Sequence, residues 1–155
     1  MDLIGAHRRS FMATEHVAAE ITDASQRGRY DQARRAGWIA QECIADLAEV
    51  DIFLRLQDQG SLGAGERSAI AVALNRGYRL AVDDNAAIKR AVREAAVVPQ
   101  ELRIVRTEDI ILELIRHGLL TIADADEMLA DWAANHRFRL RFPSFRVLLN
   151  PETPA

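Results

Sequence analysis

The chain has 155 residues, a formal net charge of −3 and a single cysteine. This length is sufficient for one domain with a sizeable core, and the near balance of acidic and basic residues argues against nucleic-acid binding over the whole surface. With Cys43 as its single cysteine, the chain cannot form an internal disulfide, which fits a reducing cytoplasm. Cys43 is expected to be a small core side chain. No apolar run reaches about 18 residues, the length of a membrane span, so we expect a cytoplasmic protein.

Short apolar segments alternate with segments of helical periodicity, which is the pattern of an α/β fold with a parallel sheet. The polar segment 28–37 is expected to be a loop, and residues 150–155, with two prolines, a tail. The expected strands are residues 10–13, 38–43, 78–83 and 102–106. The expected helices are residues 15–27, 46–58, 65–76, 85–96, 107–117 and 121–134.

The first strand and helix direct an acid inward. Thr14 is the expected N-cap of a helix in which Val17, Glu20 and Ile21 fall on one face. Glu20 is therefore a carboxylate on an otherwise apolar stripe. Glu15, one turn earlier, is explained as an acid that the positive end of the helix dipole favours.

Zinc-binding and nucleotide-binding patterns are not found in the sequence. The histidines at 7, 16, 117 and 136 have no HExxH-like spacing, and no GxSxG elbow indicates a nucleophilic serine. Glycines at 60, 63 and 65 lead into an acidic helix start rather than to a lysine. This favours a flexible connector over a phosphate cradle.

Three further acids lie at the two ends of residues 62–84. A helix of eleven residues spans about 16 Å, and a strand of six residues returns about 20 Å, so Glu66 and the pair Asp83 and Asp84 should meet at one end. Glu66 also shares a helical face with Ile70 and Leu74, which predicts that it points toward the sheet.

Two interpretations of these acids remain open. In the first, Glu66 is a first-turn acid favoured by the helix dipole, while Asp83 and Asp84 cap the helix that follows. In the second, the carboxylates converge on a divalent cation, because converging negative charges repel each other unless a cation neutralises them. The acid at Glu20 favours the second interpretation, since ligand sites in parallel sheets gather at the carboxyl ends of strands.

Three segments of the sequence resemble a known protein family. The segment LGAGERSAIAVALNRGYRLAVDDNAAIKRA resembles part of the PIN-domain proteins, the ribonuclease fold of VapC-type bacterial toxins, and its most specific feature is a GE-x-x-AI helix followed by a strand ending in DD. RSFMATEHVAAEI and VRTEDIILELIRHGLLTIADADEML resemble the flanking parts of that family. The resemblance covers most of residues 10–145 and implies a three-layer domain with a central parallel sheet flanked by helices.

The resemblance also implies a reaction. Glu20, Glu66 and Asp84 correspond to acids that hold one or two Mg²⁺ or Mn²⁺ ions beside a scissile RNA phosphate, with Asp83 as the neighbouring alternative. The ion would activate a water molecule and stabilise the developing charge on the phosphate. Thr107 lies where the family often has a small polar residue. The resemblance further implies that the protein forms a homodimer and that an antitoxin protein binds it.

One departure from the family pattern concerns the first strand. Such domains begin with a buried strand that ends in an aspartate, whereas MDLIGAHRRSFM resembles the helix after that strand. Asp2 would fall in the helical connector, so a main metal ligand is missing from the pattern. We expect residues 1–149 to form one PIN-like domain that lacks this strand.

Residues 135–149, NHRFRLRFPSFRVLL, alternate basic and aromatic side chains. Arg137, Arg139 and Arg141 could hold phosphates while phenylalanines stack on bases, which suits a groove for single-stranded RNA. The alternative is a terminal strand or hairpin that buries the phenylalanines and exposes the arginines, or a dimer contact. The sequence favours this alternative, because alternation alone predicts it.

Two functions follow from these observations. The first is a Mg²⁺- or Mn²⁺-dependent endoribonuclease, which could be the toxin of a toxin–antitoxin pair. The second is a noncatalytic binding module that keeps the fold without the metal site. A small-molecule phosphohydrolase is a more distant third, since it would normally carry an aspartate nucleophile after its first strand.

Overall fold

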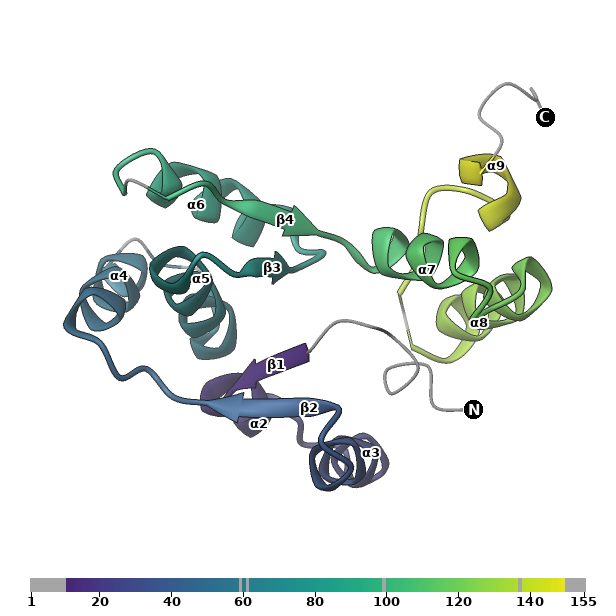
Figure 1. The fold of residues 1–155 in the computed structure, drawn as a ribbon, viewed down its shortest axis with the longest axis horizontal. Coiled ribbons are helices and arrows are strands. Elements are labelled where there is room, and N and C mark those ends of the chain that lie inside the picture. Colours follow the sequence, from purple (N-terminus) through teal and green to yellow (C-terminus); the bar gives the residue numbers. More distant parts are fainter. Residues whose placement is uncertain (1–10, 59, 61, 99, 137, 150–155) are drawn as a thin grey trace. The chain divides into compact units, whose positions relative to one another are not determined.

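The computed structural model describes residues 11–149 except 59, 61, 99 and 137 (Figure 1). These residues form two compact units, 11–105 and 106–149. Asp2, Arg137 and the expected tail lie outside the described residues. Helices and strands alternate along the first unit, so the predicted α/β class is confirmed.

The first unit contains the four described strands, and the ends of each lie within two residues of a segment that the sequence predicts to be a strand. Its elements are β1 (Phe11–Thr14), α2 (Glu15–Glu20), α3 (Ala24–Arg35), β2 (Ile39–Glu42), α4 (Leu47–Asp58), α5 (Ala64–Arg76), β3 (Arg79–Ala81), α6 (Asn85–Ala95) and β4 (Arg103–Val105). Two segments differ from expectation by more than two residues: the helix expected at 15–27 ends at Glu20, and the loop expected at 28–37 is largely helical.

Helix α3 forms despite its polar sequence. Asp23 caps it by accepting a hydrogen bond from the backbone N–H of Gln26 at 2.9 Å. Only Tyr30 and Ala33 of this helix are buried, so a narrow apolar face suffices to hold it. The expectation of a loop was wrong because polarity marks an exposed helix as readily as a loop.

The described strands form two small parallel sheets. β1 pairs with β2, with Phe11 opposite Ile39, and β3 pairs with β4, with Arg79 opposite Arg103. Parallel pairing is therefore confirmed. The mixture of helices and parallel strands is thus confirmed, but the described strands form two separate sheets and not the single central sheet of the expected three-layer arrangement.

Helix α5 lies at the centre of this unit. Five consecutive residues, 70–74, are each no more than 5% exposed. A helix that is apolar on all sides is enclosed on all sides, and α5 accordingly packs against α2, α4, β1 and β3. It ends at Gly77, whose left-handed conformation (φ 67°, ψ 28°) favours glycine and confirms the stop expected there.

A buried ion pair joins α4 to α5. Glu49 is fully buried, and its carboxylate accepts hydrogen bonds from Arg76 Nε at 2.5 Å and Nη2 at 2.9 Å. Asn75 and the backbone N–H groups of Ala45 and Asp46 donate to the same carboxylate at 3.2, 3.0 and 3.3 Å. The buried charge is thus compensated by donors around it.

Cys43 is exposed, so the expectation of a core side chain was wrong. The residue follows β2 directly, and its backbone carbonyl accepts a hydrogen bond from Arg76 Nη2 at 3.0 Å. Arg76 also pairs with Glu42 at the end of β2. The backbone of Cys43 thus provides one more acceptor for Arg76.

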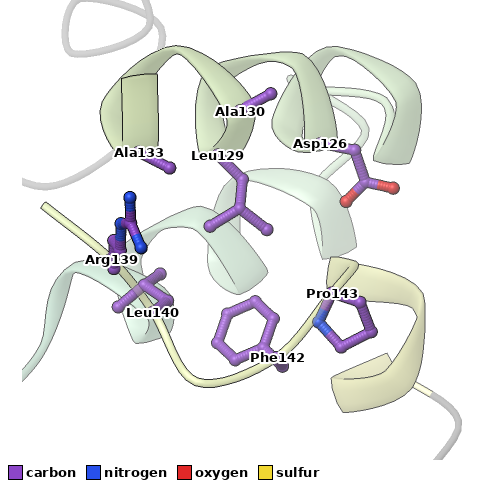
Figure 2. A pocket seen from close by; sticks show the side chains of 8 residues that line it. All are labelled: Asp126, Leu129, Ala130, Ala133, Arg139, Leu140, Phe142 and Pro143. Carbon is purple, nitrogen blue, oxygen red and sulfur yellow. The ribbon is translucent and has the colours of Figure 1, made fainter. Parts of the chain in front are cut away.

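The second unit is helical, with α7 (Thr107–Arg116), α8 (Ile122–Asn135) and α9 (Phe145–Leu149). Phe145 is fully buried in its core. Asp126 of α8 anchors the start of α9, because its carboxylate accepts hydrogen bonds from Ser144 Oγ at 2.7 Å and from Phe145 N at 2.9 Å. A pocket of about 290 Å³ lies between α8 and residues 139–143 (Figure 2).

The basic and aromatic segment forms no strand among its described residues. Phe138 and Phe142 are half-buried, whereas Arg139 and Arg141 are exposed. The alternation of inward and outward side chains is therefore as expected, but the terminal strand is not: the segment runs without regular structure into α9. Of the helices in the described part of the chain, none combines the length and apolar character that a membrane crossing needs.

Candidate functional site

Glu20 lies where helix α2 meets the first turn of α5. It is the last residue of α2, and its Oε1 accepts a hydrogen bond from the backbone N–H of Gly65 at 2.8 Å. The residue as a whole is exposed. The N–H groups of a first helical turn have no partner within the helix and favour negative charge, so α5 itself fixes this carboxylate.

The approach of Glu20 depends on two glycines. A Cβ atom on Gly63 would lie 2.9 Å from Glu20 Oε1, and one on Gly65 would lie 2.8 Å from Glu20 Cδ. Real Cβ atoms essentially never show contacts under 3.0 Å. Any side chain at these positions would therefore displace the carboxylate, which is the far end of a flexible side chain and can shift at little cost. The sequence pattern predicts only a connector for these glycines, although their position next to an acidic helix start was the available signal.

Glu66 attaches to the same turn. Its Oε2 accepts a hydrogen bond from the backbone N–H of Gly63 at 3.1 Å, as expected of an acid in the first turn of a helix. The carboxylate thus turns back over Gly63, at the start of its own helix. Each of the two acids, Glu20 and Glu66, uses one oxygen for a backbone N–H, and within the described residues the other oxygen accepts no hydrogen bond.

A buried pair of hydroxyls fixes α2 on α5. Thr14 Oγ1 and Ser68 Oγ lie 2.6 Å apart, and both residues are buried. Ser68 Oγ also donates to the carbonyl of Gly65 at 2.8 Å, while Thr14 Oγ1 caps α2 by accepting from Val17 N at 3.2 Å. The two ends of α2 are therefore both bound to α5, which restricts where Glu20 can lie. Ser68 was not among the expected site residues.

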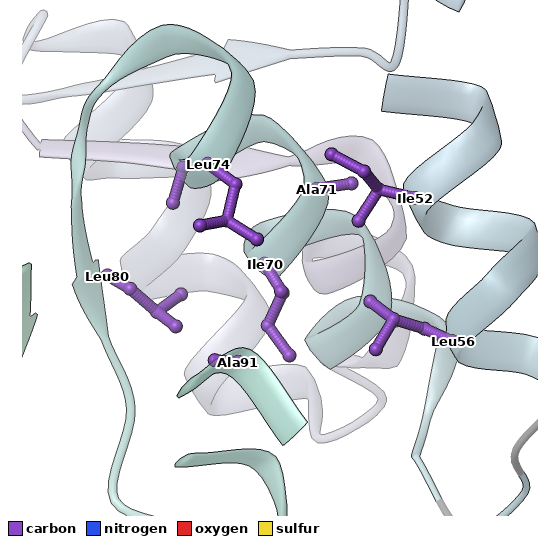
Figure 3. Packing of buried hydrophobic residues seen from close by; sticks show 8 residues of the cluster. Ile52, Leu56, Ile70, Ala71, Leu74, Leu80 and Ala91 are labelled. Atoms are coloured by element: carbon purple, nitrogen blue, oxygen red, sulfur yellow. The ribbon is translucent and has the colours of Figure 1, made fainter. Parts of the chain in front are cut away.

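Strand β3 runs back along α5. Figure 3 shows Leu80 of β3 beside Ile70 and Leu74 of α5, in one apolar cluster. This return follows from the tight turn at Gly77, and it brings the chain after β3 back toward the first turn of α5. Helix α5 and strand β3 thus run in opposite directions. This is the arrangement from which Glu66 and the pair Asp83 and Asp84 are expected to lie at the same end.

Asp84 is the N-cap of α6. Its Oδ1 accepts a hydrogen bond from Ala87 N at 2.8 Å, and the residue is exposed. The capping interpretation therefore holds for Asp84. Asp83 is half-buried. Thr107 begins α7 in the other unit.

The carboxylates at this site are of the type that binds a divalent cation, but among the described residues too few of them lie together to hold one. Carboxylate oxygens are the ligands that Mg²⁺ and Mn²⁺ prefer, and Glu20 and Glu66 each keep one such oxygen. In the described part of the chain, however, no three side chains of the metal-binding types gather closely enough to hold an ion. Asp84 therefore does not complete a group of three with Glu20 and Glu66.

Comparison with protein families gave one finding. A family model described as a PIN domain matches residues 1–149. Comparison with curated proteins and with solved structures gave no match. The match spans both units and includes every site residue that the sequence predicts.

Proposed function

Because the chain belongs to the PIN-domain family over residues 1–149, we propose that it is an endoribonuclease that depends on Mg²⁺ or Mn²⁺. PIN domains are generally dependent on divalent metals. The observation that carries the proposal is the attachment of two carboxylates, Glu20 and Glu66, to one turn of α5 with an oxygen left on each.

The residues of this chain have separate tasks in the proposed reaction. Glu20 and Glu66 would hold the cation through their remaining oxygens, and Asp84, with Asp83 as the alternative, would join them when the cation binds. Fixed carboxylates suit this task, because hydrogen bonds from the protein to a ligand orient it and tune its basicity. The bound cation would supply the activation of water and the stabilisation of negative charge on the phosphate.

The exposed side chains Arg139 and Arg141, with Arg137 beside them in sequence, would contact the RNA backbone. We further propose that the protein is cytoplasmic, that it forms a homodimer, and that an antitoxin protein is its partner. These proposals rest on the family resemblance. In the three-layer arrangement that the family resemblance implies, the two parallel sheets would be two halves of one central sheet.

The test of the proposed function is cleavage of single-stranded RNA by the purified protein with and without Mg²⁺ or Mn²⁺. We expect cleavage only with the metal, and a loss of at least about 100-fold in Glu66→Gln, because removing one metal ligand typically removes most activity. Glu15→Gln is the matched control, since Glu15 is also a first-turn acid but lies on α2. Equal cleavage by Glu66→Gln and the unchanged protein would contradict the proposal.

A noncatalytic binding module is the second candidate. It is favoured by the finding that no three metal-binding side chains gather in the described residues. Thermal unfolding in rising Mn²⁺ separates the two functions. A ligand at 100 times its dissociation constant stabilises the folded state by about 2.7 kcal/mol, so a metal enzyme should show a rising Tm that Glu66→Gln abolishes, whereas the module should show none.

A further inference from the structure

We propose that Gly65 is a positioning residue, whose missing side chain allows the Glu20 carboxylate to dock on the first turn of α5. The proposal rests on the proposed function for its effect on activity, but the docking itself is independent of that function. It assigns to Gly65 a task that it performs through Glu20. Gly63 contributes to the same space.

The backbone alone does not explain these glycines. Gly63 has φ −63° and ψ 161°, a conformation that any residue adopts, and Gly65 lies within the helix α5. Glycine inside a helix is less favourable than alanine because it loses more conformational freedom on folding. At the N-cap position, serine, threonine, aspartate and asparagine would add a hydrogen bond that glycine cannot form. Both positions thus lack a conformational reason for glycine.

The space above these residues supplies the reason. Gly65 is itself buried, and the Glu20 carboxylate occupies the volume that its Cβ would take. The same peptide unit donates the hydrogen bond that holds Glu20 Oε1. Steric room and a charge-assisted hydrogen bond therefore come from one residue.

This arrangement couples Gly65 to Glu20 and, through Gly63, to Glu66. Glu20 Oε1 lies near the position of a Gly63 Cβ, and the N–H of Gly63 donates to Glu66 Oε2. A side chain at Gly65 would push Glu20 away from the turn while leaving Glu66 in place. The expected result is a separated pair of acids on an intact fold.

Thermal unfolding tests the docking without any assay of activity. Gly65→Ala should raise Tm little or not at all in the unchanged chain, because the Glu20 carboxylate must shift and loses its hydrogen bond to the Gly65 N–H. In a Glu20→Ala background the same substitution should raise Tm by about 2–4 °C, because only the helical preference of alanine remains. Gly28→Ala, in α3 with nothing within 4 Å of its Cβ, is the control and should give the same shift in both backgrounds. Equal shifts for Gly65→Ala in the two backgrounds would overturn the proposal.

RNA cleavage tests the consequence. Gly65→Ala should raise the Mn²⁺ concentration for half-maximal cleavage by about tenfold, and Glu20→Ala/Gly65→Ala should be no less active than Glu20→Ala alone. An unchanged metal dependence in Gly65→Ala would refute the positioning role. If the unchanged protein cleaves no RNA, the proposed function fails, and the difference between the Tm shifts of Gly65→Ala in the two backgrounds still decides whether Gly65 makes room for Glu20.

Discussion

Arg76 compensates the fully buried carboxylate of Glu49, so replacing Arg76 should destabilise the protein. Arg76→Met leaves the carboxyl group of Glu49 buried, with only Asn75 and two backbone N–H groups as donors. Breaking a buried pair on one side is strongly destabilising, so we expect a loss of about 3 kcal/mol in the free energy of unfolding. Chemical denaturation at neutral pH measures it.

An exposed pair of the same type provides the control. Arg103 and Glu101 are 67% and 76% exposed in their side chains, with an N–O distance of 3.1 Å. Exposed pairs contribute about 0–1 kcal/mol, so Arg103→Met should change stability little. A comparable loss in both variants would show that burial does not govern the effect.

Asp124 carries a pH-dependent contribution to stability. The hydroxyl of Thr121 donates to Asp124 Oδ2 at 2.5 Å and its backbone N–H at 3.2 Å, and these bonds hold the pKa of the carboxyl below its usual value. A lowered folded pKa gives stability that is complete above the unfolded value, about 3.9, and is lost as the pH falls through the folded value.

Thr121→Ala should therefore raise the pKa of Asp124 toward its usual value, because the hydroxyl is the larger of the two causes. An NMR titration of the Asp124 carboxyl carbon measures this directly, with the exposed Asp51 as an internal reference. The stability of the variant should also depend less on pH below about 4. A pKa of Asp124 that is the same in both proteins would contradict the assigned cause.

At the scale of elements, two glycines should respond to alanine in opposite directions. Gly28 lies inside α3 without a positive φ, so Gly28→Ala should stabilise the protein by about 0.4–1 kcal/mol. Gly77 ends α5 at φ 67°, so Gly77→Ala should destabilise it by about 1 kcal/mol. The midpoint of urea unfolding measures both. Destabilisation by Gly28→Ala would mean that this residue is not helical in solution.

The same elements show what sequence patterns can predict. Periodic apolar residues located α4 to α8, and the apolar runs located all four strands within a residue or two. α3 was missed because only two of its residues are buried, so its sequence carries almost no periodicity. α9 was missed because the alternation of arginine and phenylalanine has the period of a strand, whereas Pro143 and the anchoring of Ser144 by Asp126 decide the local conformation.

For the candidate site, the sequence predicted the acids but not how they are held. Chain direction alone indicates that Glu66 and the end of β3 share one end of a unit. The contact of Glu20 with Gly65 joins residues 45 positions apart, and no local pattern encodes such a contact. Capping and metal binding require the same residue types at the same places, so the sequence could not separate them.

At the scale of the whole molecule, an acidic protein that binds RNA must do so through a local basic surface. If Arg139 and Arg141 bind phosphates, replacing both with alanine should make RNA binding less dependent on salt. The slope of log affinity against log salt should fall by about 0.7 for each phosphate that is no longer neutralised. Arg29→Ala/Arg35→Ala, two exposed positions of α3, is the control. Equal slopes for both double variants would place the RNA elsewhere.

The enclosure of α5 has a consequence for hydrogen exchange. Backbone amides of residues 70–74 can reach solvent only when the packing around them opens, since those residues are at most 5% exposed. They should therefore exchange only through cooperative unfolding of residues 11–105, whereas the amides of the largely exposed α3 should exchange through local fraying. The exchange rate of the slowest amide in α5 would then give the free energy of unfolding of residues 11–105.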